Sequence, residues 1–250
     1  MKKLLVLIMA ALMILAMAVA GCGGDDKADK GSTAHKEKLV IGTDADINNL
    51  NLQKQQDAAN NFILKNTHQT LVFFNNGSQG KERFGPGLAT DWKFVDDTHI
   101  IMNLRKDVYF NDGKKTPMTA DDVKFTLDMA MKNVIKSALA GYVKSTVKDK
   151  YQIEIEISSY NNEFIQSLSS VPLSIQSKKA YDDGVKEPWL IGTGPYKYDK
   201  WVQGEYCRLT KVKDYWGNNL PATDNFAPGV SDIIEFRPMI EASARVMALQ

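Results

Sequence analysis

The sequence predicts an α/β fold, in which short β-strands and amphipathic helices share hydrophobic cores. Three observations predict it. A short apolar run at Leu39–Ile41 stops at a glycine, which is typical of a buried strand. The sequence Thr-Ala-Asp-Asp from Thr119 opens an apolar pattern at helical spacing. Apolar and polar residues alternate from Tyr151 to Ile157, as in a strand with one face in solvent.

The N-terminus has the pattern of a bacterial lipoprotein signal peptide. Lys2 and Lys3 precede an uncharged apolar run over residues 4–20, and small residues then lead into Cys22. Signal peptides have this order of regions, and the run is short for a membrane span. We therefore expect a signal over residues 1–21 and acylation of the Cys22 thiol. Lipid on Cys22 would anchor the chain in the bilayer of the cell membrane, facing the extracytoplasmic side. The alternative is an uncleaved anchor helix with an incidental cysteine.

Residues 22–38 are expected to form a flexible tether. The stretch Gly23–Lys38 is rich in Gly, Asp and Lys and lacks large apolar residues. Such a composition cannot bury enough apolar surface to offset the entropy of ordering the chain. The folded part is therefore expected to begin at residue 39.

The first folded segment is expected to contain the strand Leu39–Ile41 and a helix over Asn60–Leu71. The strand ends at Gly42-Thr43-Asp44. The helix is predicted from apolar residues at helical spacing, which are Phe62, Ile63, Leu64 and Leu71.

Turn sequences then separate several short strands. The pair Asp96-Asp97 lies between the predicted strands Trp92–Val95 and His99–Arg105. A further apolar run, Val108–Phe110, precedes Asn111-Asp112-Gly113, where glycine can supply a positive φ angle. This part of the chain is predicted to be rich in hairpins.

A capped helix is predicted after Thr119. The Thr119 hydroxyl can cap the N-terminus, and the Asp122 carboxylate at the third helical position can accept from the Thr119 backbone. The apolar positions that follow at helical spacing are Val123, Leu127, Met131 and Val134.

Beyond the alternating strand Tyr151–Ile157, the pattern continues with short elements. The predicted elements are a helix at Phe164–Leu168, a strand at Leu173–Ile175, a hairpin of Tyr196–Val202 and Glu205–Val212 around Gln203-Gly204, and a strand at Ile233–Arg237. Pro188-Trp189 and Gly192-Thr193-Gly194-Pro195 interrupt the pattern and indicate a bend in the chain.

The stretch Glu241–Gln250 predicts a helix with an apolar side. It has no glycine or asparagine cap and no polar tail. A helix of this length with an exposed apolar side is marginal on its own. We therefore expect the sequence to be a fragment of a longer chain.

Composition excludes several classes of function. The chain has 31 basic and 30 acidic residues, so no basic surface is expected to bind nucleic acid. Three histidines, His35, His68 and His99, lie far apart and lack the spacing of a metal site, and no cofactor is expected. Of the two cysteines, Cys207 has no expected disulfide partner and is predicted to be a buried structural thiol.

No arrangement typical of catalysis is found, so we expect the protein not to be an enzyme. There is no G-x-S-x-G elbow, and no histidine lies in a catalytic motif. Adjacent aspartates such as Asp121-Asp122 suit turns and caps and do not approach a substrate from opposite sides. A secreted hydrolase and a purely structural lipoprotein are the alternatives from other classes.

Several sequence stretches together resemble a known family. They are Pro86-Gly87-Leu88-Ala89-Thr90-Asp91-Trp92, Leu104 to Gly113, Met118 to Val123, Gly192-Thr193-Gly194-Pro195-Tyr196 and Asp214-Tyr215-Trp216. In this order and spacing the chain resembles the extracytoplasmic solute-binding lipoproteins of ABC importers, in the class that binds peptides or nickel (family 5). The resemblance covers residues 39 to 250. It departs from the family pattern at Asn49-Leu50-Asn51, where members often have Leu-Asp-Pro.

The resemblance implies the type II periplasmic-binding-protein fold. Residues 39–70 and 191–250 would belong to the first lobe and residues 71–190 to an extra subdomain, while the second lobe would be missing. Family members are about twice as long as this chain. The implied function is to bind a small solute, most simply a dipeptide or oligopeptide, and to deliver it to the permease subunits of an ABC transporter. A nickel chelate is the alternative ligand, and the protein is expected to be a monomer.

Topology indicates where the ligand would bind. In open α/β sheets, ligands bind on loops beyond the carboxyl ends of strands. The strand Leu39–Ile41 leads to four polar candidates, Thr43, Asp44, Asp46 and Asn48. Asp44 or Asp46 would meet a cationic group such as a peptide's amino terminus, or would cap the loop. Trp189 would form a wall for an apolar side chain, or would pack in the core.

Overall fold

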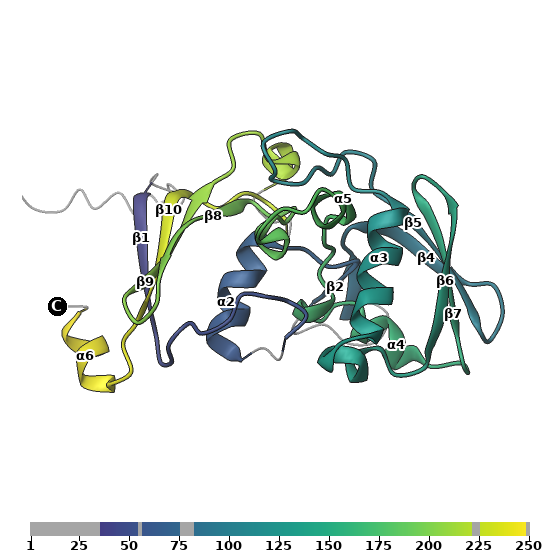
Figure 1. Ribbon diagram of the computed structural model, residues 1–250, viewed down its shortest axis with the longest axis horizontal. Coiled ribbons are helices and arrows are strands. Elements are labelled where there is room, and N and C mark those ends of the chain that lie inside the picture. Colours follow the sequence, from purple (N-terminus) through teal and green to yellow (C-terminus); the bar gives the residue numbers. More distant parts are fainter. Residues whose placement is uncertain (1–35, 55–56, 76–82, 222–225, 249–250) are drawn as a thin grey trace, which may run out of the picture. The chain divides into compact units, whose positions relative to one another are not determined.

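The computed structural model describes residues 36–54, 57–75, 83–221 and 226–248 (Figure 1). The predicted signal, Cys22 and the tether up to residue 35 lie outside the described residues. So does the end of the chain at Leu249 and Gln250. The predictions for the signal, the lipid anchor and the tether therefore remain predictions. Within the described residues, no helix has both the length and the apolar character that a membrane crossing requires.

A four-stranded mixed sheet joins the two ends of the described chain. Its strands are β1 (Lys36–Thr43), β8 (Tyr196–Val202), β9 (Tyr206–Lys211) and β10 (Ser231–Pro238), in the order β1-β10-β9-β8. The strands β1 and β10 are parallel, and the other pairs are antiparallel. Figure 1 shows the purple strand β1 beside the yellow strand β10.

The predicted strands of this sheet are confirmed. The β8–β9 hairpin turns at Gly204, whose φ is +77°, a value that glycine adopts without steric cost. The strand predicted at Leu39–Ile41 is longer than expected because its backbone pairs with β10 from Lys36 to Thr43. Pairing between distant segments, and not only local apolar character, sets the ends of this strand.

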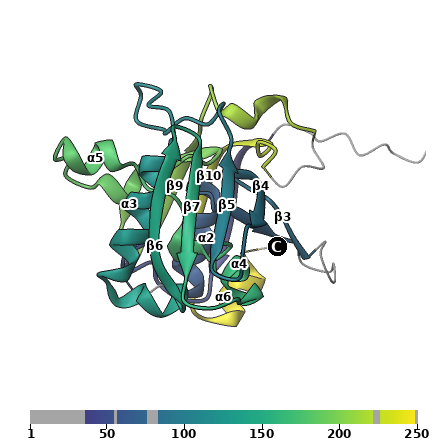
Figure 2. The same cartoon turned by 90° about the vertical axis from the view of Figure 1, so that its right-hand side faces the viewer.

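A second four-stranded sheet is antiparallel throughout. It contains β4 (Ala89–Phe94), β5 (His99–Leu104), β7 (Gln152–Ile157) and β6 (Tyr142–Asp149), in the order β4-β5-β7-β6. Figure 2 shows it face on. The predicted hairpin around Asp96-Asp97 is confirmed. The strand β6 was not predicted, because its sequence is rich in Lys, Ser and Thr.

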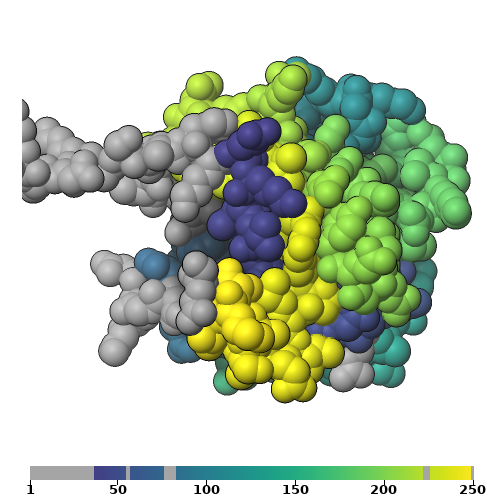
Figure 3. Space-filling model, turned by 90° about the vertical axis from the view of Figure 1, so that its left-hand side faces the viewer, coloured from purple at the N-terminus to yellow at the C-terminus, as the bar shows by residue number. Residues whose placement is uncertain are grey.

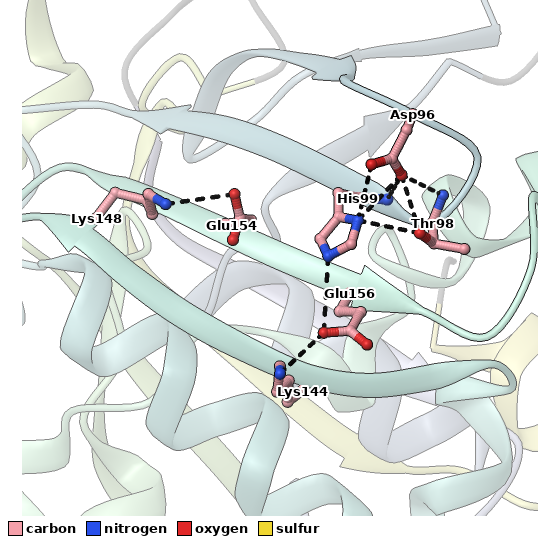
Figure 4. A network of polar contacts seen from close by, with 7 residues as sticks. All are labelled: Asp96, Thr98, His99, Lys144, Lys148, Glu154 and Glu156. Atoms are coloured by element: carbon pink, nitrogen blue, oxygen red, sulfur yellow. Dashed lines mark hydrogen bonds and ion pairs between the residues drawn. The ribbon is translucent and has the colours of Figure 1, made fainter.

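The outer face of this antiparallel sheet is polar (Figure 4). The Asp96 carboxylate accepts from the backbone N–H groups of Thr98 (2.7 Å) and His99 (2.8 Å) at the hairpin turn. Glu156 lies 3.7 Å from His99 Nε2 and 3.1 Å from Lys144 Nζ. Exposed pairs of this kind contribute little to stability. They keep one side of the sheet in solvent while isoleucines fill the other.

Helices and a small third sheet complete the fold. The α-helices are α2 (Ala58–Thr67), α3 (Ala120–Met131), α4 (Asn162–Ser167), α5 (Lys178–Asp182) and α6 (Ala242–Met247). The 3₁₀-helices are η2 (Val134–Leu139), η3 (Val171–Leu173), η4 (Pro188–Leu190) and η5 (Trp216–Asn219). The strands β2 (Val72–Phe74) and β3 (Phe84–Pro86) form a two-stranded sheet.

The capped helix predicted after Thr119 is confirmed. The Asp122 Oδ2 atom accepts from the Thr119 backbone N–H at 2.8 Å. The second oxygen, Oδ1, accepts from the Lys178 backbone N–H at 2.9 Å. One buried carboxylate therefore caps α3 and fixes the start of α5.

Two predicted helix boundaries are wrong. The helix α3 ends at Met131, and Val134 lies beyond it with 71% of its surface exposed. Asn133 ends the helix: its backbone is extended and its side chain donates to the Met129 carbonyl (2.7 Å). The helix predicted over Asn60–Leu71 begins earlier and ends at Thr67.

The strand predicted at Leu173–Ile175 is also wrong. Residues 171–173 form the 3₁₀-helix η3, with Pro172 in its first turn. Proline fixes φ near the helical value and lacks an N–H for strand pairing. The predicted C-terminal helix over Glu241–Gln250 is present as α6 but is described only over Ala242–Met247.

Two hydrophobic cores lie within the compact unit that contains the described residues. The larger core draws its buried members from Leu71 to Ile175 and fills the space between the antiparallel sheet and α3. The smaller core packs Ile47, Leu50 and Ile63 against residues of β8, β9 and β10. The division of the chain at residues 70 and 190 stays a prediction.

Candidate functional site

The candidate site is the edge of the mixed sheet where β1 and β10 end. Because these strands are parallel and Thr43 is opposite Pro238, both chain segments leave the sheet at the same edge. Loops beyond the carboxyl ends of neighbouring parallel strands are the usual ligand-binding places in open α/β sheets. We name this edge, with residues 44–54, Asp57 and residues 239–241, the carboxyl edge.

Thr43 holds the two departing segments together. Its hydroxyl donates to the carbonyl oxygens of Ala45 (2.9 Å) and Arg237 (3.3 Å). Its own carbonyl accepts from the Met239 N–H at 2.7 Å. The Thr43 side chain is buried, and its hydroxyl proton serves contacts within the protein.

The candidates Asp44 and Asp46 differ in their surroundings. Asp46 is half-buried, and its Oδ1 accepts from the backbone N–H groups of Ile47 (2.8 Å) and Gly204 (3.3 Å). It therefore caps the loop and joins it to the β8–β9 turn. Asp44 is exposed and forms no hydrogen bond or ion pair with the residues that the structure describes. Its carboxylate is thus available to a cationic group.

Asn48 connects the loop to the N-terminus of α2. Its Oδ1 accepts from Asn60 Nδ2 at 2.9 Å, and its Nδ2 donates to Asp57 Oδ2 at 3.2 Å. The other Asp57 oxygen caps the helix by accepting from the Asn60 N–H at 3.0 Å. The sequence did not predict this capping role of Asp57, because the helix was expected to begin at Asn60.

Trp189 lies away from the other four candidates. It is half-buried in η4, beside His68 at the C-terminal end of α2. Burial lowers the pKa of His68 to about 4, and a hydrogen bond with the Trp189 backbone opposes this effect only in part. Asn48 is at the opposite end of α2, and a ten-residue helix is about 15 Å long. The structure therefore brings Thr43 to Asn48 together and leaves Trp189 outside that group.

Buried polar atoms near the same loop lack partners within the described residues. They include Gln53 Nε2 and Asn60 Oδ1. The other amide atom of Gln53, Oε1, accepts from Asn133 Nδ2 at 3.3 Å. Gln53 is 7% exposed and Asn60 is fully buried. Buried polar groups nearly always find a partner, so such groups next to a loop favour a bound solute or water there. The sequence did not indicate a role for Gln53, because nothing in its local sequence distinguishes it from a surface glutamine.

The bend at Gly192-Thr193-Gly194 positions the mixed sheet against α2. A Cβ atom on Gly192 would lie 2.0 Å from the Thr67 carbonyl oxygen, and one on Gly194 would lie 2.6 Å from that of Asn66. The glycines therefore allow the chain to cross directly over the end of α2. This geometry agrees with the interpretation of the motif as a bend.

The acidic, histidine and cysteine side chains of the described residues do not gather into a metal site. Within the described ranges, no group of three or more His, Cys, Asp or Glu side chains could hold a metal ion. Cys207 is fully buried, and burial raises the pKa of its thiol to about 12, as expected of a structural cysteine.

The sequence of the chain is similar to a family of bacterial binding proteins and to individual members of it. Residues 83–250 match the sequence profile of the bacterial extracellular solute-binding proteins, family 5, middle region. The oligopeptide-binding protein AppA of Bacillus subtilis is 25% identical over 100% of this chain and 47% of its own length. The glutathione-binding protein GsiB of Escherichia coli K12 is 26% identical over 85% of this chain and 40% of its own. The chain thus spans less than half of the length of these curated relatives.

A solved structure shows the same arrangement of elements. The periplasmic binding protein DppA from Helicobacter pylori, in complex with the peptide STSA, matches with a TM-score of 0.73 and 27% identity. The match covers 87% of this chain and 45% of that one. The predicted fold, part of the type II periplasmic-binding-protein architecture, is confirmed by this likeness.

Proposed function

Since the chain belongs to family 5 of the bacterial extracellular solute-binding proteins, we propose that it is a receptor that captures short peptides for an ABC importer. The observation that carries this proposal is the carboxyl edge, where polar side chains gather at the ends of two parallel strands. The likeness to a peptide complex supports the choice of peptide as the solute. Glutathione, named for other relatives, is itself a tripeptide and belongs to the same chemical class.

Asp44 is proposed to meet the amino terminus of the peptide. An exposed carboxylate without a partner inside the protein binds a cationic group at a smaller cost in free energy than a carboxylate that is already hydrogen-bonded, because no existing contact must break. Asp46, Thr43 and Asn48 would instead hold the loop in shape, since their polar atoms are occupied within the protein. The unpartnered amide of Gln53 is proposed to reach solute or ordered water in the same region.

The relatives' additional length is proposed to form the second lobe. The strand β1 and the segment around α6, which Figure 3 shows on one face of the molecule, carry exposed apolar side chains. They are Leu39, Val40, Ile240, Val246 and Met247. The unpaired edge of β1 lies beside them in the described sheet. Packing of a second lobe there would bury this surface and close the site around the solute.

The membrane attachment is proposed from the sequence. Acylation of Cys22 would keep the receptor close to its permease subunits and raise its effective concentration there. Residues 22–35 would serve as the tether, since β1 begins at Lys36 and not at residue 39 as expected. Residues 36–70 and 191–250 would be parts of the first lobe, and residues 71–190 the extra subdomain. The receptor is proposed to act as a monomer and to carry out no catalysis itself.

Thermal unfolding of the full-length protein tests the proposal. A ligand that binds only the folded state stabilises it by about 2.7 kcal/mol at a hundredfold excess over its dissociation constant. We expect di- and tripeptides to raise the melting temperature. A panel in which peptides, glutathione, nickel chelates and sugars all leave it unchanged would refute a solute-binding role, and a response to nickel chelates alone would replace peptide as the solute.

The variant Asp44→Asn tests the proposed contact, with Asp97→Asn as its control. Both aspartates are exposed and form no ion pair with described residues, but Asp97 lies in the hairpin turn of the antiparallel sheet. We expect Asp44→Asn to weaken binding of a peptide with a free amino terminus about tenfold, and an N-acetylated peptide to be insensitive to it. Equal affinities in both variants would remove Asp44 from the site.

A further inference from the structure

The strand registers give the two faces of the mixed sheet different characters. Ile234 on β10 is paired with Leu209 on β9, and both lie in the smaller hydrophobic core, together with Ile63 of α2. Because successive side chains of a strand alternate, the next pair along these strands, Glu235 and Arg208, lies on the opposite face. We name this opposite face, which is turned away from α2, the outer face. Figure 3 shows the sheet from this side.

The outer face collects basic side chains from all four strands. One row of paired residues runs from Lys38 on β1, across β10 and β9, to Lys197 on β8. The next row runs through Glu235 and Arg208 to Lys200. The basic residues of the outer face are Lys38, Lys197, Lys200, Arg208 and Arg237. The registers place all of them on one face, and each keeps part of its surface exposed.

The outer face carries more positive than negative charge. Its acidic residues are Glu235, which pairs with three of the cations, and Asp199, whose Oδ2 lies 3.9 Å from Arg208 Nη1. Five basic and two acidic side chains leave a net charge of +3, in a chain whose total is +1. Lys197 and Lys200 are exposed and form no ion pair with the residues that the structure describes. Their charges are therefore available to an anionic partner.

The layout of these cations suits a charged plane. Neighbouring strands lie about 4.8 Å apart and every second residue of a strand lies about 6.6 Å further along, so the side chains are spread over a surface. Lysine and arginine can lay their aliphatic stems along such a surface and extend their charged ends into solvent. A bilayer that contains anionic lipids attracts basic residues close to it. An anionic bilayer is therefore the partner that this distribution of charge fits best.

The path of the chain also keeps the sheet near a bilayer. Strand β1 begins at Lys36, directly after the predicted tether, and the residues between Cys22 and Lys36 can span at most about 50 Å. A lipid on Cys22 would thus hold the mixed sheet within that distance of the membrane. This step alone rests on the membrane attachment proposed above, and the charge of the outer face does not depend on it.

We propose that the outer face of the mixed sheet docks on an anionic lipid surface. Lys197 and Lys200 contact the headgroups directly, because they are exposed and have no counter-charge among the described residues. The other three cations hold Glu235 and add to the attraction. Strand β8 lies at the opposite edge of the sheet from β1, so a second lobe at β1 and α6 leaves it free for this contact. The carboxyl edge then lies beside the bilayer and stays open to solute.

Binding of the full chain to vesicles tests the proposal. Phosphatidylcholine vesicles with and without phosphatidylglycerol isolate the charge-dependent part of the binding, since the N-terminal apolar run is the same in all variants. The unmodified chain is compared with the double variant Lys197→Gln, Lys200→Gln. The control is Lys132→Gln, Lys136→Gln, which removes the same charge from exposed residues that follow α3, outside the mixed sheet. The assay needs neither a peptide nor acylation of Cys22, so its failure is distinct from a failure of those proposals.

We expect the outer-face variant to lose at least about tenfold in phosphatidylglycerol-dependent affinity, while the control variant keeps the affinity of the unmodified chain. Glu235→Gln should act in the opposite direction and raise that affinity about fivefold, because it removes a negative charge from the outer face. Absence of phosphatidylglycerol-dependent binding in the unmodified chain, or equal losses in the two double variants, would overturn the proposal. Binding to polyglutamate but not to vesicles would indicate an acidic protein as the partner and would overturn it as well. If the outer-face variant does not fold, Lys200→Gln alone repeats the measurement.

Discussion

Arg237 and Glu235 lie two residues apart on β10 and form a double contact, Nε to Oε1 at 2.7 Å and Nη2 to Oε1 at 2.6 Å. The other carboxylate oxygen of Glu235 lies 3.0 Å from Lys38 on β1 and 3.0 Å from Arg208 on β9. The Glu235 side chain has no exposed surface, while its three cationic partners remain partly exposed. One buried carboxylate thus joins three adjacent strands of the mixed sheet.

The first prediction is an acid-dependent loss of stability that arises from Glu235. Burial would raise the pKa of Glu235, but hydrogen bonds from Lys38, Arg237 and Arg208 lower it to about 2. Its pKa is therefore lower in the folded than in the unfolded state, so the stabilisation is complete above the unfolded pKa, near 4.5, and is lost as the pH falls toward 2. Urea unfolding of the unmodified protein and of Glu235→Gln at several pH values between these limits checks this.

At neutral pH, Glu235→Gln should lower the free energy of unfolding by about 1–2 kcal/mol, because the three cations are partly exposed and can regain water. The variant should also depend less on pH than the unmodified protein below pH 4.5. Glu205→Gln, in the exposed turn between β8 and β9, is the control and should match the unmodified protein. If the free energy of unfolding had the same pH dependence in Glu235→Gln and in the unmodified protein, Glu235 would not be the source of the acid-dependent loss of stability.

The second prediction concerns the cap of α3. Asp122→Ala removes the acceptor for the backbone N–H groups of both Thr119 and Lys178. Because both donors lie in partly buried surroundings, we expect a loss of about 2 kcal/mol in the free energy of unfolding. The neighbour Asp121 is exposed in the same first turn. Asp121→Ala should lower the free energy of unfolding by about 0.5 kcal/mol, through the helix dipole alone. Chemical denaturation measures both variants, and equal losses in Asp121→Ala and Asp122→Ala would contradict the capping role of Asp122.

The third prediction concerns the reactivity of Cys207. The thiolate is the reacting form, and burial raises the pKa of the Cys207 thiol to about 12. We expect iodoacetamide at mildly alkaline pH to leave the peptide that contains Cys207 unmodified in the native protein. The same peptide should react completely in guanidinium chloride, as measured by mass spectrometry. Rapid modification in the native state would show that the strand β9 opens locally.

The fourth prediction concerns the glycine that crosses α2. In Gly192→Ala the new methyl group would overlap the Thr67 carbonyl oxygen and the His68 ring. Overpacking of this kind typically costs about 1–3 kcal/mol. Gly85→Ala is the control, since a Cβ there has no heavy atom within 4 Å. In thermal unfolding, the melting temperature of Gly192→Ala should be well below that of Gly85→Ala. Equal melting temperatures would show that the bend can move away from α2.

Local sequence patterns predicted those elements whose ends are decided by neighbouring residues. The cap of α3 needs only Thr119 and Asp122, and the β8–β9 turn needs only a residue that accepts positive φ at Gly204. The alternation in β7 likewise shows which side is buried, because successive side chains of a strand point to opposite faces. The structure confirms the predictions of these features, which depend on neighbouring residues and not on tertiary contacts.

Part of the candidate site was also predictable. A polar loop after an apolar strand indicates a ligand-binding edge in an α/β protein, and this identified Thr43 to Asn48. The sequence did not show that Asp46 and Asn48 are held by Gly204 and Asn60, whereas Asp44 is left without a partner among the described residues. Partners so far apart along the chain leave no local pattern.

The sequence by itself determined the character of most described segments, as strand or helix, buried face or solvent face, but not that of β6 or of residues 171–173. Only the tertiary structure decided which segments pair, for example β1 with β10, and it placed Trp189 at the far end of α2 from the loop that holds the other four candidates. The pairing of β1 also lengthened a strand that looked short, and the lysine-rich β6 became a strand through its pairing with β7. The physical reason is that backbone hydrogen bonds between strands are similar for all residues, so the shared packing of distant side chains selects the partner.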